Sequence, residues 1–180
     1  MVEELKNIKD FTSLKKFFKE HKDVLEYLKK YEGLDNLLGS GNYGKVFKIK
    51  NQNAVLKITT DKQEIRKCLK LQGKTNKHLI DIYHVNVIKP NLAIIEAEML
   101  YPLSPDKKRE VLPNIQYMSW YFNDESGESS PFDGKDITMK TFVKETYIEV
   151  IANGLEPETI DIHMGNVLQT KDNKLKLIDI

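Results

Sequence analysis

The stretch TIDIHMGNVLQTKDNKLKLIDI (residues 159–180) stands at the end of the chain, and the rest of the sequence is organised around it. It carries Asp161, then Asn166 five residues later and Asp179 a further thirteen residues on. Transfer of a γ-phosphoryl group needs a carboxylate near the attacking hydroxyl, and amide and carboxylate oxygens that hold magnesium. Each residue alone is also compatible with a turn, a helix cap or a solvated chain end. Their order and spacing must therefore be weighed with the rest of the chain.

The composition indicates an ordinary folded protein. The 180 residues are 40% hydrophobic and 31% charged, which is enough for one sizeable domain or two small lobes. No apolar run approaches the roughly 18 residues that a membrane span needs. The polar start MVEELKNIKD is not a secretory signal. We therefore expect no membrane partner.

Charge and cysteine content narrow the expected partners and location. The formal net charge is +1, so no global field draws the protein onto nucleic acid. The only arginines are Arg66 and Arg109, so the planar fork that contacts guanine is scarce. The single cysteine, Cys68, rules out an internal disulfide and fits a reducing compartment. We expect a cytoplasmic protein that binds no nucleic acid.

Residues 1–32 carry apolar side chains three and four positions apart. This pattern predicts two short amphipathic helices, with Thr12 or Ser13 as the first cap. We expect an extension that packs on the next domain, in preference to a separate hairpin that binds a partner. The apolar positions are Phe11, Leu14, Phe17, Phe18, Val24, Leu25, Leu28 and Tyr31.

A strand-rich segment begins at about residue 37. Alternation predicts a strand with Val46, Phe47 and Ile49 on its apolar side, and a turn at residues 51–53 leads into a second strand, AVLKI. Two further strands are predicted over residues 78–88 and 91–100. The segment between the two pairs of strands has a helical period over residues 61–72, with Asp61 as its cap, Gly73 at its end, and Ile65, Cys68 and Leu69 on its buried face.

The second half of the chain is predicted to be mainly helical. Ser104 followed by Pro105 is typical of a helix start, and this helix should run to about Tyr121. Residues 123–135 are polar and rich in turn formers, so we expect an exposed loop there. Two short strands, NVLQ and KLKLIDI, end the sequence around a KDN turn. The helix between loop and strands should be capped by Asp136, end at residues 153–154 and bury Ile137, Phe142, Val143, Tyr147, Val150 and Ile151.

The glycine-rich string GSGNYGKV (residues 39–46) is the first candidate binding motif. Glycines allow positive φ and close approach of backbone amides to a ligand, so Gly39, Gly41 and Gly44 are candidates for contact with phosphate. A Walker-type phosphate loop does not fit, because Val46 occupies the position of its Ser or Thr and a strand follows. The same following strand argues against a dinucleotide fingerprint. The motif therefore predicts a glycine-rich turn within a hairpin, as in a flap over a nucleotide.

Lys57, on the next strand, is the second candidate. Its ammonium group is suited to nucleotide phosphates, and Glu64 on the following helix is the carboxylate available to hold it. A strand lysine that merely faces solvent is the alternative, and the seven-residue separation from Glu64 is a short reach from strand to helix.

Together these motifs resemble those of the protein-kinase-like fold. GSGNYGKV is similar to the family's GxGxxGxV, AVLK to its VAIK, IDIHMGN to its catalytic loop and LIDI to the start of its DFG segment. The spacings of Asp161, Asn166 and Asp179 also match the usual arrangement. The resemblance implies an α+β, bilobal fold with a strap near residues 98–102. We expect a helical extension (residues 1–33), an N-lobe with an antiparallel sheet and one helix (residues 34–100), and a minimal or truncated helical C-lobe (residues 101–180).

The resemblance also implies roles for individual residues. ATP would lie under Gly39, Gly41, Gly44 and Val46, with Lys57 on its α and β phosphates, Glu64 paired with Lys57, and Glu98, Met99 and Leu100 near the adenine. Asp161 would be the catalytic base, and Asn166 and Asp179 would bind Mg²⁺.

The catalytic-loop string departs from that of eukaryotic-type kinases. Thr159 and Ile160 stand where those enzymes have His and Arg, and His163 stands where they have Lys. The form Asp-x-His-x-Gly-Asn is similar instead to aminoglycoside and choline phosphotransferases and to early protein kinases of bacteriophages. Without the catalytic-loop arginine, we expect no switching by activation-loop phosphorylation. Only Ile180 follows Asp179, so the activation segment and the peptide-binding helices are not in this sequence, and we expect either a naturally minimal protein or a fragment.

Three functions remain open from the sequence. The first is an ATP- and Mg²⁺-dependent kinase that phosphorylates protein Ser or Thr hydroxyls, as in takeover of a host cell by a phage and then in the host cytoplasm. The second is a pseudokinase-like module that binds and modulates a host protein. The third is a small-molecule phosphotransferase, which His163 and Gly165 favour.

Overall fold

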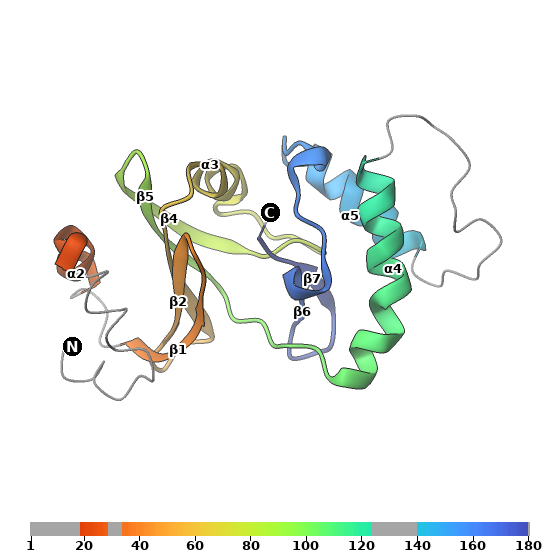
Figure 1. The fold of residues 1–180 in the computed structure, drawn as a ribbon, viewed down its shortest axis with the longest axis horizontal. Helices are drawn as coiled ribbons and strands as arrows, with labels where there is room; N and C mark the ends of the chain where they lie inside the picture. The colour runs from red at the N-terminus through yellow and green to blue at the C-terminus, as the bar shows by residue number, and fades with distance from the viewer. Residues whose placement is uncertain (1–18, 29–33, 124–139, 180) are drawn as a thin grey trace. The chain divides into compact units, whose positions relative to one another are not determined.

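The computed structural model describes residues 19–28, 34–123 and 140–179 (Figure 1). Within them the fold is α+β, with a five-stranded antiparallel sheet and helices, which confirms the predicted class. The contacts divide the chain into two compact units. The first is Met1–Gln72 with Ile82–Met99, and the second is Gly73–Asp81 with Leu100–Ile180. None of the helices in the described ranges combines the length and the apolar character needed to cross a membrane.

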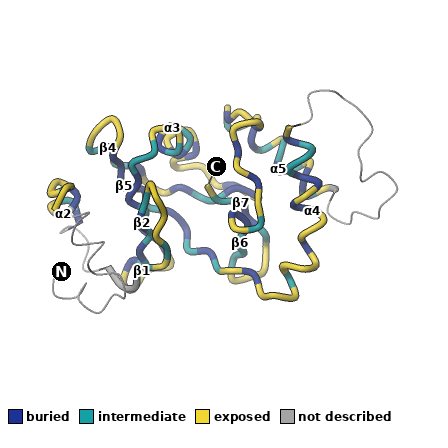
Figure 2. Tube along the Cα trace, in the orientation of Figure 1, coloured by how far each residue is buried: buried dark blue, intermediate teal, exposed yellow. Residues whose placement is uncertain are grey.

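The first unit is built on the five-stranded sheet. Its order is β1-β2-β3-β5-β4, and every neighbouring pair is antiparallel. β3 and β5 lie inside the sheet and are buried along most of their length, as Figure 2 shows for β5. The strands are β1 (Leu34–Ser40), β2 (Gly44–Ile49), β3 (Ala54–Thr59), β4 (Ile82–Lys89) and β5 (Leu92–Glu98).

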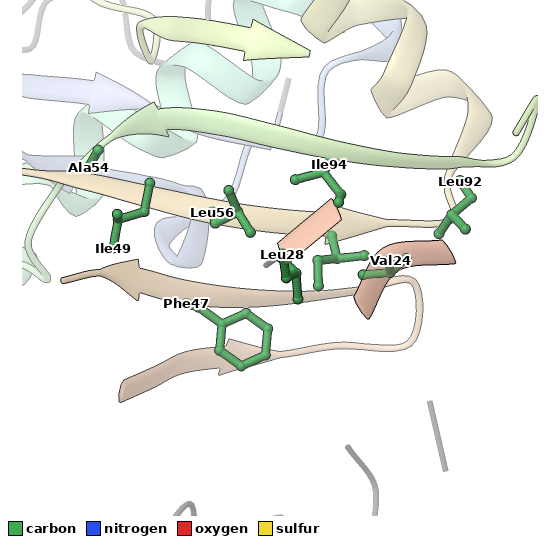
Figure 3. Close-up of a cluster of buried hydrophobic side chains, with 9 residues drawn as sticks. Val24, Leu28, Phe47, Ile49, Ala54, Leu56, Leu92 and Ile94 are labelled. Atoms are coloured by element: carbon green, nitrogen blue, oxygen red, sulfur yellow. The ribbon is translucent and has the colours of Figure 1, made fainter. Parts of the chain in front are cut away.

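Helix α2 (Lys22–Leu28) packs on one face of this sheet. Figure 3 shows Val24 and Leu28 directed at the strands that carry Phe47, Leu56 and Ile94. All five side chains are at most 1% exposed, so α2 completes an apolar core. The second predicted N-terminal helix is therefore present and packed on the sheet. The first, with its proposed cap at Thr12 or Ser13, lies outside the described residues.

Helix α3 (Lys62–Leu71) begins and ends where the sequence predicts. The Asp61 carboxylate accepts hydrogen bonds from the amides of Gln63, at 2.7 Å, and Glu64, at 3.3 Å, as an N-cap does. Gly73, with φ of 75°, follows the end of the helix and takes the left-handed conformation that glycine favours. α3 contacts β4 and β5.

Three predicted burial assignments are wrong. Leu69 is 47% exposed because the buried face of α3 repeats every three residues, at Ile65, Cys68 and Leu71. Ile151 is 51% exposed, although Val143 and Val150 of the same helix are buried. Val46 lies on the face of β2 opposite to Phe47 and Ile49, because side chains alternate strictly along a strand.

The second unit combines two helices with a small sheet. α4 (Pro105–Asn123) contacts α5 (Lys140–Ala152) and the short turns η2 (Pro157–Thr159) and η3 (Met164–Asn166). The Ser104 hydroxyl accepts a hydrogen bond from the Lys107 amide at 3.2 Å, which confirms the predicted helix start. α5 ends at Ala152, just before Gly154, whose φ is 68°. Asp136, Ile137 and the predicted loop after Asn123 lie outside the described residues.

The small sheet recruits a segment from between α3 and β4. β6 (Val167–Gln169) pairs with β7 (Leu175–Leu177) around the predicted turn. The Leu177 amide donates to the His78 carbonyl at 2.7 Å, and the Ile80 amide donates to the Leu177 carbonyl at 3.0 Å. Residues 78–80 were predicted to begin a long strand that continues into β4. They pair with β7 instead, so β4 begins only at Ile82.

Carboxylates of α5 hold this recruited segment in place. Glu149 accepts hydrogen bonds from the backbone amides of Lys77, at 2.6 Å, and His78, at 2.8 Å. Glu145 binds the side chains of the same two residues, at 2.7 and 2.8 Å. The hydrogen bond from Lys77, followed by that from His78, lowers the pKa of the Glu145 carboxyl. Residues 73–81 are thereby part of the second unit.

Candidate functional site

The glycine-rich string forms the tip of the β1–β2 hairpin. The Gly41 amide donates to the Gly44 carbonyl at 3.0 Å and closes the turn. Tyr43 at the tip is 65% exposed, and its carbonyl accepts the Thr60 amide at 2.7 Å. The turn is therefore attached to the end of β3.

The three glycines meet different requirements. A Cβ added at Gly44 would lie 2.8 Å from the Ile58 carbonyl oxygen, so only glycine fits between the two strands. A Cβ at Gly39 or Gly41 would meet nothing within 4 Å. None of the three has φ in the left-handed region, so the turn does not use the positive φ that glycine allows. The close approach of β2 to β3 explains the glycine at position 44. At Gly39 and Gly41 the absence of a side chain leaves the backbone open to a ligand.

Lys57 of β3 lies directly opposite Val46 of β2 on one side and Ile95 of β5 on the other. Residues opposite each other in a sheet share a face, so Lys57 and Val46 are neighbours near the glycine turn. The Lys57 ammonium forms an ion pair with Glu64 of α3. Their side chains are 26% and 12% exposed, so this pair is largely shielded from water.

Thr59 explains how Glu64 reaches Lys57 across so short a connection. Its hydroxyl donates to Glu64 Oε2 at 2.6 Å and accepts the Asp61 amide at 3.1 Å. The same hydroxyl thus joins the end of β3, the cap of α3 and the carboxylate. With Asp61 starting the helix at once, Glu64 falls on the first turn and faces the sheet.

Glu98 is the last residue of β5, and Met99 and Leu100 follow it. Glu98 is paired with Ala54 and is 9% exposed, and Leu100 is 7% exposed. The Met99 amide donates to the Asn53 carbonyl at 3.2 Å. The Met99 amide is therefore committed to the turn before β3 and is not available to donate to adenine.

In the second unit, Asn166 organises the loop that follows η2. Its side-chain amide nitrogen donates to the Asp161 carbonyl at 2.9 Å, and its own carbonyl accepts the Ile178 amide at 2.8 Å. Asn166 is 5% exposed, whereas the Asp161 side chain is 74% exposed. The loop backbone is thus fixed from within, while the carboxylate of Asp161 is directed to solvent.

The oxygen atoms near Asn166 are of the type that Mg²⁺ prefers. The Asn166 amide nitrogen is committed to Asp161, so the amide oxygen is the atom suited to a cation. Asp179 directly follows the residue that bonds to Asn166, and its backbone is left-handed, with φ of 57°. No group of three or more His, Cys, Asp or Glu residues suited to a metal occurs in the described ranges. A donor set of one amide and one carboxylate fits Mg²⁺, which is usually completed by water and phosphate oxygens.

His163 is a polar group of this loop that received no role from the sequence. Its Nδ1 accepts the Gly165 amide at 3.0 Å, and its Nε2 lies 3.4 Å from Asp161 Oδ2. Asp161 and His163 are two residues apart, and Gly165 follows after two more. This spacing is the only sequence signal for the contact, since many loops contain such residues without it.

We compared the chain with models of known protein families and with curated protein sequences, and neither comparison gives a match. The resemblance to kinase-like proteins therefore rests on the motifs and their spacing. The structure pairs Lys57 with Glu64 in one unit and joins Asn166 to the Asp161 carbonyl in the other.

Proposed function

We propose that the chain is an ATP- and Mg²⁺-dependent phosphotransferase of protein-kinase-like fold that modifies Ser or Thr hydroxyls of a protein. The observation that carries this proposal is the shielded Lys57–Glu64 ion pair beside the glycine turn. A strand lysine that merely faces solvent has no need of a carboxylate fixed by Thr59 and a helix cap. The order of β1, β2, β3, α3, β4 and β5 agrees with the N-lobe that the resemblance implies.

In the proposed reaction, Lys57 neutralises charge on the α and β phosphates of ATP, and Glu64 holds its ammonium group. Asp161 accepts the proton of the acceptor hydroxyl. The hydroxyl oxygen forms a bond to the γ-phosphorus, the bond from that phosphorus to the β–γ bridging oxygen breaks, and ADP leaves. Asn166 and Asp179 would hold Mg²⁺, which would supply charge neutralisation for the phosphate oxygens when bound.

The acceptor class comes from the resemblance of the Asp-x-His-x-Gly-Asn string to phage protein kinases. The structure supports a glycine-rich turn and a lysine ammonium group held by a carboxylate. Any kinase-like phosphotransferase would use both. A test must therefore separate the acceptors as well as detect transfer.

The test uses the purified chain with γ-labelled ATP, Mg²⁺ and a bacterial lysate whose own kinases have been inactivated by heat. We expect labelled proteins that contain phosphoserine or phosphothreonine. Asp161→Asn should lower labelling by about 100-fold or more, because it removes the general base. The matched control is Asp172→Asn, an exposed aspartate of the β6–β7 turn in the same unit, which should label like the wild type.

Each alternative function has its own outcome. Label in a small molecule alone would overturn the protein acceptor and indicate a small-molecule phosphotransferase. ATP binding without any transfer would overturn the proposed enzymatic activity and indicate the pseudokinase-like module. Equal labelling by wild type and Asp161→Asn would refute the role of Asp161.

A further inference from the structure

We propose that His163 is a positioning residue, whose imidazole orients the Asp161 carboxylate for proton acceptance; this inference rests on the proposed phosphotransfer. The resemblance places a lysine at this position in eukaryotic-type kinases, so the sequence alone gives His163 no role. Its contacts within the loop supply one.

The hydrogen bond from Gly165 fixes the tautomer of His163. Nδ1 accepts the Gly165 amide at 3.0 Å, and a ring nitrogen that accepts a hydrogen bond carries no proton. In the neutral ring the proton is therefore on Nε2. Nε2 is the atom that lies 3.4 Å from Asp161 Oδ2, so its N–H is available to that carboxylate oxygen.

Gly165 provides a second, steric observation. A Cβ at this position would lie 2.7 Å from Cε1 and 2.9 Å from Nδ1 of the His163 ring. Real side-chain contacts are not that short, so any other residue would displace the ring. The glycine therefore accommodates the imidazole in the one place from which it reaches both the Gly165 amide and Asp161.

The exposure of Asp161 shows why such a partner matters. Its side chain is 74% exposed, and an exposed carboxylate samples several rotamers. The backbone on both sides is already fixed, since Asn166 donates to the Asp161 carbonyl and to the His163 carbonyl. An N–H of His163 at Oδ2 selects one carboxylate orientation and leaves Oδ1 to accept the hydroxyl proton.

A purely structural role for His163 is the competing explanation. Its ring also caps the three-residue turn η3 through the Gly165 amide. Two substitutions separate the roles, because each keeps one half of the imidazole. His163→Asn places an acceptor where Nδ1 lies but has no N–H that reaches Asp161. His163→Gln keeps an N–H at the reach of Nε2 but loses the acceptor for Gly165.

The kinetic test measures kcat and the KM for ATP with the labelled acceptor protein. If His163 orients Asp161, His163→Asn lowers kcat by about 10- to 100-fold, the range for residues that orient a catalytic group, with KM for ATP unchanged. His163→Gln should recover most of that loss. His84→Asn, a change at an exposed histidine of β4, is the matched control and should leave kcat unaltered. Full activity in His163→Asn, or recovery by Asn but not by Gln, overturns the inference.

A measurement without nucleotide or metal completes the test. Two-dimensional NMR that correlates ring nitrogens with ring protons reports which nitrogen of His163 carries the proton. We expect the Nε2–H tautomer in the wild type and its loss in Gly165→Ala, with circular dichroism as the check that this variant folds. An Nδ1–H tautomer in the wild type overturns the inference even if the enzyme is active. Absence of phosphotransfer in the wild type instead overturns the proposed function, and the positioning role with it.

Discussion

The two units hold their candidate groups in opposite ways. In the first unit, Lys57 and Glu64 are 26% and 12% exposed and are fixed by their own side-chain contacts. In the second unit, Asp161 and His163 are 74% and 53% exposed, and hydrogen bonds of the loop backbone fix them instead. In the first arrangement the ion pair is shielded and contributes to the stability of the fold. In the second, exposed side chains project from a loop whose backbone is held by hydrogen bonds.

This difference predicts how stability and activity separate. A largely shielded charge that loses its partner costs folding free energy, whereas an exposed carboxylate can be replaced with little effect on folding. Substitutions in the first unit should therefore change both stability and activity. Substitutions of Asp161 should change activity alone.

The largest stability effect is expected for Glu64→Ala. It leaves the Lys57 ammonium without the Glu64 carboxylate and removes the acceptor for Thr59, so we expect a loss of about 2–3 kcal/mol. Asp161→Ala should stay within about 0.5 kcal/mol of the wild type. Denaturation followed by circular dichroism measures both values.

Hydrogen exchange locates these effects within the chain. Glu64→Ala should lower the protection of amides in β3 and α3. Glu64→Gln keeps the shape and a polar acceptor, so its protection should lie between that of the wild type and that of Glu64→Ala. If Glu64→Ala and Asp161→Ala lose the same free energy of unfolding, the proposed distinction between the units is wrong.

A smaller effect is expected within the glycine turn. Gly44→Ala forces a Cβ to 2.8 Å from the Ile58 carbonyl, so one strand must shift, at a cost of about 1–2 kcal/mol. Gly41→Ala is the control, because its Cβ meets nothing within 4 Å. Thermal melting of both variants measures the difference. If Gly41→Ala proves as destabilising as Gly44→Ala, the close approach of the strands does not explain the glycine.

Local patterns predicted much of the fold. The cap at Asp61, the start of α4 after Ser104 and the turn near Asn51, whose φ is 59°, each depend on a few neighbouring residues. Burial was harder to predict at Leu69, because one helical turn holds two apolar residues and only packing decides which is buried. The glycine turn was also predicted, and close approach of the backbone, not positive φ, accounts for Gly44.

Contacts between distant residues could not be predicted from the sequence. Residues 78–80 look like the start of a strand, and nothing local indicates that Leu79 pairs with Leu177. The sequence proposed Glu64 as the partner of Lys57, but the contact depends on the Thr59 hydroxyl. The contact of His163 with Asp161 follows from the orientation of one ring, which residue types do not encode.

The smallest effect concerns Glu145, a partly exposed carboxylate of the second unit that binds the exposed side chain of Lys77 and the buried side chain of His78. These partners lower its pKa below the ordinary value of 4.5, so its stabilisation is present above pH 4.5 and is lost as the pH falls through the folded-state pKa. Glu145→Gln should therefore melt at a slightly lower temperature than the wild type at pH 7, and the difference should vanish in acid.

The matched control for that variant is Glu158→Gln, a change at an exposed glutamate of η2 in the same unit. It should melt like the wild type throughout the pH series. The contrast with Glu64 is informative, since both glutamates bind a lysine but only Glu64 is shielded from water. A Glu145→Gln effect as large as that of Glu64→Ala would show that exposure is not what separates the two kinds of pair. A difference that persists below the folded-state pKa of Glu145 would show that the charge of its carboxylate is not the cause.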